Sequence, residues 1–215
     1  MKKFALLLVF ILSASIAQAQ GEHKVNMGFD LGVGPHYFNS DRNNPATYAG
    51  VVGYEYVYLG IFAVEVGAKI GGFNQKVGYV PSYNPEHPSF ETSENWARDV
   101  YRGMFFSPFI APKLYIPVSE DHKLLRARKL FLENRFMFTH SRLDLDRFEA
   151  MTGTKVNNHF DYEVRVGFLY PISQHVDLNV ALGYSTYNFG RIDKKNIKFK
   201  NTTPISIGIG ASYAF

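Results

Sequence analysis

The chain has 215 residues, enough for one domain or at most two, and it contains no cysteine, which excludes a disulfide framework. Its 23 Lys and Arg residues stand against 19 Asp and Glu residues, a near balance from which we expect no nucleic-acid partner. The 19 Phe, 14 Tyr and 18 Gly residues argue against a small secreted binding module.

The N-terminus has the parts of a secretory signal peptide. A basic pair, Lys2 and Lys3, precedes an apolar stretch and the small-x-small sequence AQA at 17–19. We predict cleavage after this sequence, which leaves 1–19 as signal peptide and 20–215 as one exported domain. An N-terminal membrane anchor is the alternative, although the apolar stretch is short for one.

Beyond the leader, apolar residues alternate with small or polar ones, which is the pattern of β-strands. No run of 18 apolar residues predicts a transmembrane helix. Two segments are irregular: Pro108 and Pro112 predict a bulge or break, because proline cannot donate to a ladder, and Asn134 interrupts an apolar row. The eight predicted strands are 25–34, 48–58, 61–71, 104–116, 130–138, 160–172, 176–185 and 205–215.

Short and long connections alternate strictly between these strands. The short ones lie around Leu59-Gly60 and at 117–129 and 171–175, and the long ones are 37–47, 72–102, 139–158 and 186–202. Long loops on one side, short turns on the other and an even strand number are typical of an outer-membrane barrel. Both termini then lie on the periplasmic side.

The alternation by itself does not say which face is the core. The non-apolar face holds much Gly, Ala and Ser, which suits a narrow lumen, and it holds charges of both signs that can pair when enclosed. The apolar rows end in aromatic residues, as membrane interfaces favour. We therefore predict an all-β fold, an eight-stranded antiparallel transmembrane β-barrel with a side-chain-filled lumen, and a water-soluble barrel is the alternative. The predicted lumenal charge network comprises Asp30, Glu55, Glu65, Lys69, Lys113, Glu133, Arg135, Glu163 and Arg165.

Several short stretches add a family resemblance. The predicted mature start at Gln20, the turn PIS at 171–173 leading into HVDL at 175–178, and the ending GASYAF at 210–215 are the stretches concerned. With them the chain resembles the small outer-membrane barrels of the OmpA/OmpX type, and among these the PorT-like outer membrane β-barrel domain proteins of Bacteroidota. The resemblance implies a place in the cell outer membrane, with Tyr213 and Phe215 as the signal read by the barrel assembly machinery.

The composition of the long loops suits binding better than catalysis. We expect a non-enzymatic barrel without cofactor or metal. Outer-membrane lipid and lipopolysaccharide are the expected surroundings, and a protein partner is expected through the loops 72–102 and 186–202, the first of which is rich in aromatics. The second loop is basic and predicts a contact with lipopolysaccharide phosphates, or else an ordinary soluble hairpin tip. Its basic residues are Arg191, Lys194, Lys195, Lys198 and Lys200.

Two alternatives remain open. One is a barrel enzyme acting on lipid A or peptides, with a site at the outer rim near His36 and His159. The adjacent His140 and Ser141 do not form a base–nucleophile pair, because neighbouring residues of a strand point to opposite faces. The other alternative is a narrow channel through the lumenal charges.

Overall fold

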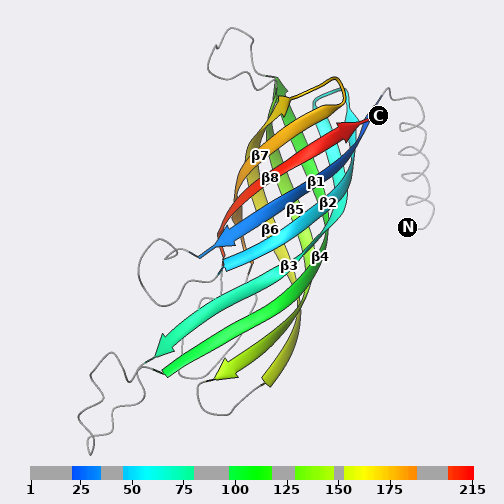
Figure 1. Cartoon of the computed structure of the whole chain (residues 1–215). Coiled ribbons are helices and arrows are strands. Elements are labelled where there is room, and N and C mark those ends of the chain that lie inside the picture. Colours follow the sequence, from blue (N-terminus) through cyan, green and yellow to red (C-terminus); the bar gives the residue numbers. More distant parts are fainter. Residues whose placement is uncertain (1–20, 35–45, 80–96, 118–128, 148–152, 188–202) are drawn as a thin grey trace, which may run out of the picture.

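The computed structural model describes residues 21–34, 46–79, 97–117, 129–147, 153–187 and 203–215. Consecutive strands pair antiparallel, and β1 also pairs with β8, which closes the sheet into a barrel (Figure 1). The predicted eight-stranded antiparallel barrel is thus confirmed. No helix in this part of the chain is long and apolar enough to cross a membrane. The strands are β1 (Glu22–Val33), β2 (Ala46–Tyr58), β3 (Phe62–Tyr79), β4 (Ala97–Pro117), β5 (Lys129–Arg147), β6 (Gly153–Pro171), β7 (Val176–Ser185) and β8 (Ile205–Ala214).

The two ends of the barrel differ. At one end, here called the turn end, β2 and β3 are joined through Leu59 and Gly60, both at positive φ, and the amide of Ile61 donates to the carbonyl of Tyr58. Gly60 suits such a tight turn because it has no Cβ to clash at positive φ. The residues between β6 and β7 and the C-terminus lie at the same end (Figure 1). The opposite end is here called the loop end.

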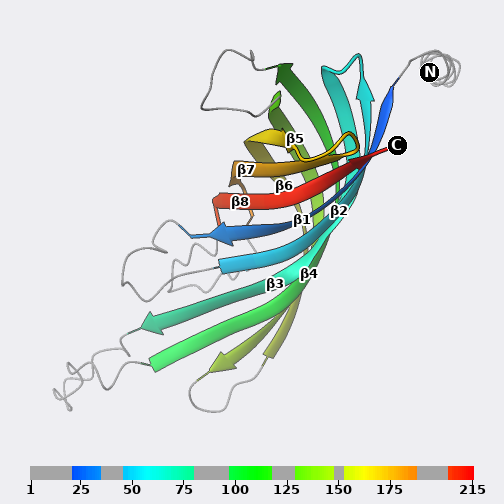
Figure 2. The same ribbon diagram turned by 45° about the horizontal axis from the view of Figure 1, so that its top comes forward.

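Four strands reach farther at the loop end than the sequence predicts. β3 pairs with β2 only as far as Asn74 and continues against β4 to Tyr79, and β5 and β6 remain paired to Leu145 and Gly153. Much of the predicted loops 72–102 and 139–158 is therefore strand, and the prediction of loop there is wrong. Figure 2 shows β3 and β4 extending beyond β1 and β2. On β5 the outward row changes there from apolar residues to His140 and Arg142, while the backbone stays paired with its neighbours.

Of the bulge or break predicted in the fourth strand, the structure shows a break in the pairing with β5 and no bulge. β4 is one strand, and its register with β5 is the same before and after the prolines, since Phe109 pairs with Met137 and Lys113 with Glu133. The pairing with β5 is interrupted beside Pro108 and Pro112 but resumes without a shift. Proline thus removes ladder hydrogen bonds here without inserting a residue.

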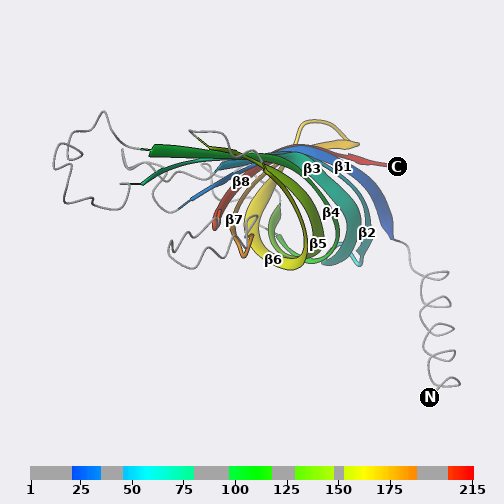
Figure 3. The same ribbon diagram turned by 90° about the horizontal axis from the view of Figure 1, so that it is seen from below.

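The barrel is apolar outside and polar inside. Side chains that point outward include Val66, 57% exposed, and Ile209, 59% exposed, whereas Glu55, Glu65 and Glu163 are almost completely buried. Seen from below in Figure 3, the strands curve round to close the sheet. This distribution is the inverse of a water-soluble protein, in which charged groups are almost never fully buried unless paired.

Glycine keeps the interior narrow enough for charged side chains to meet. A Cβ on Gly208 would collide with the guanidinium of Arg165, and a Cβ on Gly53 would collide with the carboxylate of Glu65. A side chain at either position would therefore displace a member of the ion-pair network.

Candidate functional site

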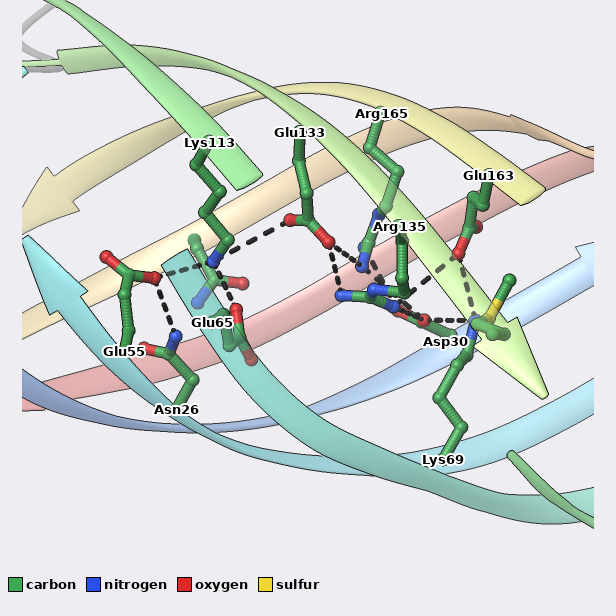
Figure 4. Close-up of polar contacts among 12 residues, drawn as sticks. Asn26, Asp30, Glu55, Glu65, Lys69, Lys113, Glu133, Arg135, Glu163 and Arg165 are labelled. Carbon is green, nitrogen blue, oxygen red and sulfur yellow. Dashed lines mark hydrogen bonds and ion pairs between the residues drawn. The ribbon is translucent and has the colours of Figure 1, made fainter. Parts of the chain in front are cut away.

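Asp30, on β1, is the centre of the buried charges. Its Oδ2 lies 2.7 Å from Lys69 Nζ on β3 and accepts a hydrogen bond of 3.1 Å from Arg135 Nη1 on β5. Its Oδ1 accepts from Arg165 Nη2 on β6 at 3.0 Å. Glu163 lies 3.2 Å from Lys69 and 3.5 Å from Arg135 (Figure 4). One carboxylate thereby joins the four strands β1, β3, β5 and β6 across the lumen.

A second group of charges surrounds Lys113 toward the turn end. Its ammonium lies 2.6 Å from Glu55 Oε2, pairs with Glu65, and lies 3.7 Å from Glu133 Oε2. Asn26 Nδ2 and the Tyr115 hydroxyl also donate to Glu55, at 2.9 and 2.5 Å. Every carboxylate of this group thus has a cationic or neutral donor, as charges buried in a low dielectric require.

Glu133 connects the two groups. Its Oε1 lies 2.7 Å from Arg135 Nη2, while its Oε2 faces Lys113 (Figure 4). The ion pairs therefore form one continuous network along the barrel interior. Such a network resists removal of any member, because each deletion leaves a buried charge without its partner.

Apolar side chains close the lumen on both sides of this network. On the loop-end side, Phe73, Phe105 and Phe109 pack together, and on the turn-end side Tyr115 and Phe131 do so. Rings also contact the cations: Arg135 lies 4.4 Å from the centre of the Phe109 ring, and Lys113 lies 5.8 Å from that of Phe131.

Two small cavities border the network within the part of the chain that the structure describes. A cavity of about 40 Å³ borders Asn26, Glu65 and Tyr115, and another of about 10 Å³ borders Thr47 and Ser206. A buried water needs roughly 10–15 Å³ by this measure, so the two spaces hold a few waters at most. The arrangement is that of a plugged barrel, in which eight strands leave an interior filled by side chains.

A separate polar chain lies nearer the loop end. His159 Nε2 is 3.1 Å from Asp161 Oδ2, which accepts a 2.6 Å hydrogen bond from the Thr139 hydroxyl. Thr139 Oγ1 lies 2.9 Å from Ser107 Oγ. All four side chains are buried, with His159 only 4% exposed. His159 thus lies in the interior rather than open to solvent at the rim.

The nine residues predicted for the lumenal network all lie in the interior and contact one another as above. The sequence analysis did not identify the neutral partners Asn26, Thr139 and Tyr115. It also did not identify the aromatic rings of the two apolar layers. The signal for the missed donors was present, since each lies at an inward position of its strand. An apolar residue at an inward position, as at Phe105 and Phe109, gives no such signal when both faces of a strand are apolar.

The predicted assembly residues lie together at the turn end. Tyr213 and Phe215 are 52% and 65% exposed, and their rings stack at 6.5 Å. Phe215 also stacks on His23 at 6.1 Å, and its amide donates to the His23 carbonyl at 3.1 Å. Phe215 thus contacts β1 across the closing seam between β1 and β8.

Other predicted features lie outside the described residues. They include His36, the segment 80–96 of the first partner loop, and the basic residues of the last loop. The basic residues of the last loop are Arg191, Lys194, Lys195, Lys198 and Lys200.

Within the described ranges, no group of three or more His, Asp or Glu side chains is placed to hold a metal ion.

Comparison with known proteins gives structural likeness without sequence likeness. No protein-family model matches the chain, and no curated protein matches it. Among solved structures it is similar to the attachment invasion locus protein Ail of Yersinia pestis, with 13% identity, coverage of 91% of this chain and 99% of that chain, and a TM-score of 0.46. The N-terminal barrel domain of Pseudomonas aeruginosa OprF shows 12% identity, coverage of 91% and 100%, and a TM-score of 0.44. Neisserial surface protein A shows 12% identity, coverage of 91% and 96%, and a TM-score of 0.42.

The fold class follows from the chain itself. The sheet is closed, so no strand edge is left between β1 and β8, as hydrocarbon surroundings require. Large apolar side chains cover the outside, and charged groups form ion pairs inside. The chain is therefore an eight-stranded antiparallel transmembrane β-barrel with a side-chain-filled lumen.

Proposed function

We propose that the chain is a non-enzymatic barrel of the outer membrane that serves a structural or surface-interaction role through its loop end. The observation that carries this proposal is the plugged lumen, in which the ion-pair network lies between two apolar layers. A solute has no wide path through it, so binding to another molecule has to use the outside of the barrel. The longest connecting segment, 80–96, joins two strands at the loop end, so we place this binding there.

The strand extensions support a role for the loop end. β3 to β6 carry the chain beyond the neighbouring strands there, and the segment 80–96 is attached to the longest of them. Rigid strands that present a connecting segment are a common way to position binding residues. Exposed Arg102 and Arg142 at the same end suit phosphate-rich lipid such as lipopolysaccharide, as proposed also for the basic segment 191–200.

Two finer parts of the proposal come from sequence resemblance. One is membership of the PorT-like barrels of Bacteroidota, and the other is recognition of Tyr213 and Phe215 by the barrel assembly machinery. We expect Phe215→Ala to lower the amount of barrel in outer-membrane fractions, whereas Phe168→Ala, which also removes an outward ring, should lower it less. Equal effects would reduce Phe215 to an ordinary interface residue.

A loop exchange tests the interaction role. Residues 80–96 are replaced by a Gly-Ser linker of equal length, and residues 118–128 at the turn end are replaced in the same way as the control. Both variants and the unaltered chain are used to capture partners from gently solubilised membranes. We expect the first replacement alone to abolish capture of partners, and capture that survives it would contradict the proposed use of this loop.

Conductance across planar bilayers tests the plugged lumen and with it the channel alternative. The purified chain should show no stable open channel of porin size. Arg135→Ala opens the centre of the network and serves as a variant in which brief conducting events are expected. Stable large channels in the unaltered chain would contradict the proposal.

A further inference from the structure

Asn134 is an exception on the outer wall of the barrel. It lies in the middle of the outward row of β5, between Leu132 and Phe136, and it is half-buried. At the corresponding outward positions of the other strands, the described residues between the two rims are Val, Ile, Leu, Phe, Met, Tyr, Ala, Gly or Pro. An amide at this depth faces hydrocarbon, where an unpaired polar group costs several kcal/mol.

The local hydrogen bonds satisfy only part of this amide. The Tyr162 hydroxyl on β6 donates to Asn134 Oδ1 at 2.5 Å, and the Tyr162 ring lies 5.2 Å from that of Phe136, which holds the phenol in place. Among the residues that the structure describes, no acceptor is placed for the two N–H groups of Asn134. The side chain therefore presents donors outward, together with one free lone pair on its oxygen.

The backbone ladder beside Asn134 is also interrupted. By the register on either side of it, Pro112 of β4 lies opposite Asn134, at a place where the β4–β5 pairing is interrupted. Pro112 has no N–H, so the ladder loses a donor beside the unpaired amide. The wall around Asn134 thus combines side-chain donors without acceptors and a gap in the backbone ladder.

We propose that the wall around Asn134, formed by β4, β5 and β6, is the contact between two copies of this chain within the membrane. A primary amide carries donors and an acceptor, so two Asn134 side chains related by a two-fold axis can pair reciprocally. Lipid tails offer no acceptor at this depth, whereas a second copy offers a matched one. The contact would also cover the exposed side chains of Ile110 and Phe136, each about half exposed.

This inference rests on the proposed membrane location, because only hydrocarbon makes the unpaired amide costly. Polar contacts between membrane segments contribute modestly, about 1–2 kcal/mol in model peptides, which corresponds to roughly tenfold in association. We therefore expect a reversible dimer that depends on protein density, and Asn134→Leu should weaken it by about tenfold.

The absence of cysteine allows a clean cross-linking test. Leu132→Cys places one thiol beside Asn134 and leaves the amide in place, and Met27→Cys places one on β1, on the opposite side of the barrel. In phosphatidylcholine vesicles at a fixed protein-to-lipid ratio, mild oxidation should give disulfide-linked dimers with Leu132→Cys and few with Met27→Cys. Adding Asn134→Leu to Leu132→Cys should reduce the rate of dimer formation about tenfold.

Insertion is measured on the same samples, by the heat-dependent gel mobility of folded barrels. An inserted barrel that cross-links equally from both cysteines, or that is indifferent to Asn134→Leu, contradicts the dimer contact alone. A chain that stays in solution without detergent or lipid contradicts the proposed location and the contact with it. Cross-linking of Leu132→Cys in native membranes to a different protein, with none to itself, also overturns a second copy as the occupant.

Discussion

Polar residues on the inner and outer faces of this barrel differ in how many partners they have, and neighbouring residues of one strand show it. On β5, Glu133 and Arg135 point inward, where each lies within ion-pairing distance of several partners. Asn134 lies between them and points outward, where its one described partner is the Tyr162 hydroxyl. The interior thus accepts full charges because they are paired, while the outer wall has almost no polar groups. The same alternation would serve a soluble barrel, but with the two faces exchanged.

A substitution in the interior should destabilise the barrel most. Arg135→Ala removes a guanidinium that contacts Asp30, Glu133 and Glu163, and it leaves these carboxylates short of a cation. Breaking a buried ion pair on one side typically costs about 3–5 kcal/mol, and we expect a loss of that size in the free energy of unfolding. Urea unfolding in lipid vesicles measures it.

A second variant tests whether a cation at this position is enough to hold the network. Arg135→Lys retains one cation in the same place and should recover part of the stability, although it cannot donate in a fork as Arg does. If Arg135→Ala unfolded at the same urea concentration as the unaltered barrel, the ion pairs of Arg135 would contribute nothing to the free energy of unfolding.

A charge placed on the outer wall should lower the free energy of unfolding somewhat less, and by a different mechanism. Ile209→Arg places a cation on the outward face of β8, at a side chain that is 59% exposed. Lipid-facing Arg near the middle of a bilayer destabilises membrane barrels by about 2–4 kcal/mol. The same substitution on a water-exposed face would be nearly neutral, so the unfolding free energy in vesicles distinguishes the two surroundings. Ile209→Val serves as the matched apolar control.

The smallest effect is expected from a charge beyond the rim. Arg142 lies on the outward face of β5 near the loop end and pairs with Asp144 at 3.9 Å, with both side chains mostly exposed. Exposed ion pairs contribute about 0–1 kcal/mol, so Arg142→Gln should barely change unfolding. A loss as large as that of Arg135→Ala would mean that this part of β5 is enclosed.

Much of this architecture could be predicted because period two determines both the strands and their faces. Rows such as that of β8, from Ile205 to Tyr213, alternate cleanly, so the sequence separates the two faces of the strand. The Gly, Ala and Ser residues between the large ones then indicate which face turns to the lumen. The loop-end extensions could not be predicted in this way. In β5, His140, Arg142 and Asp144 point outward beyond the apolar band, so the row loses its apolar character while the backbone remains paired.

The candidate site was predictable to a similar degree. Charged residues at inward positions had to meet in a lumen as narrow as eight strands allow. Which of them meet depends on the stagger between strands, and periodicity carries no such information. Asp30 and Arg165, for example, are 135 residues apart and not on adjacent strands, yet they share hydrogen bonds across the interior.

Contact between lipid and the apolar face of this barrel can be measured with a single environment-sensitive label. In the cysteine-free chain, Ile209→Cys carries a bimane fluorophore on the outward face, and vesicles contain lipids with a nitroxide quencher at mid-chain. We expect blue-shifted emission that the nitroxide quenches strongly and that aqueous iodide does not. Red-shifted emission quenched by iodide and not by the lipid nitroxide would contradict contact between this face and lipid.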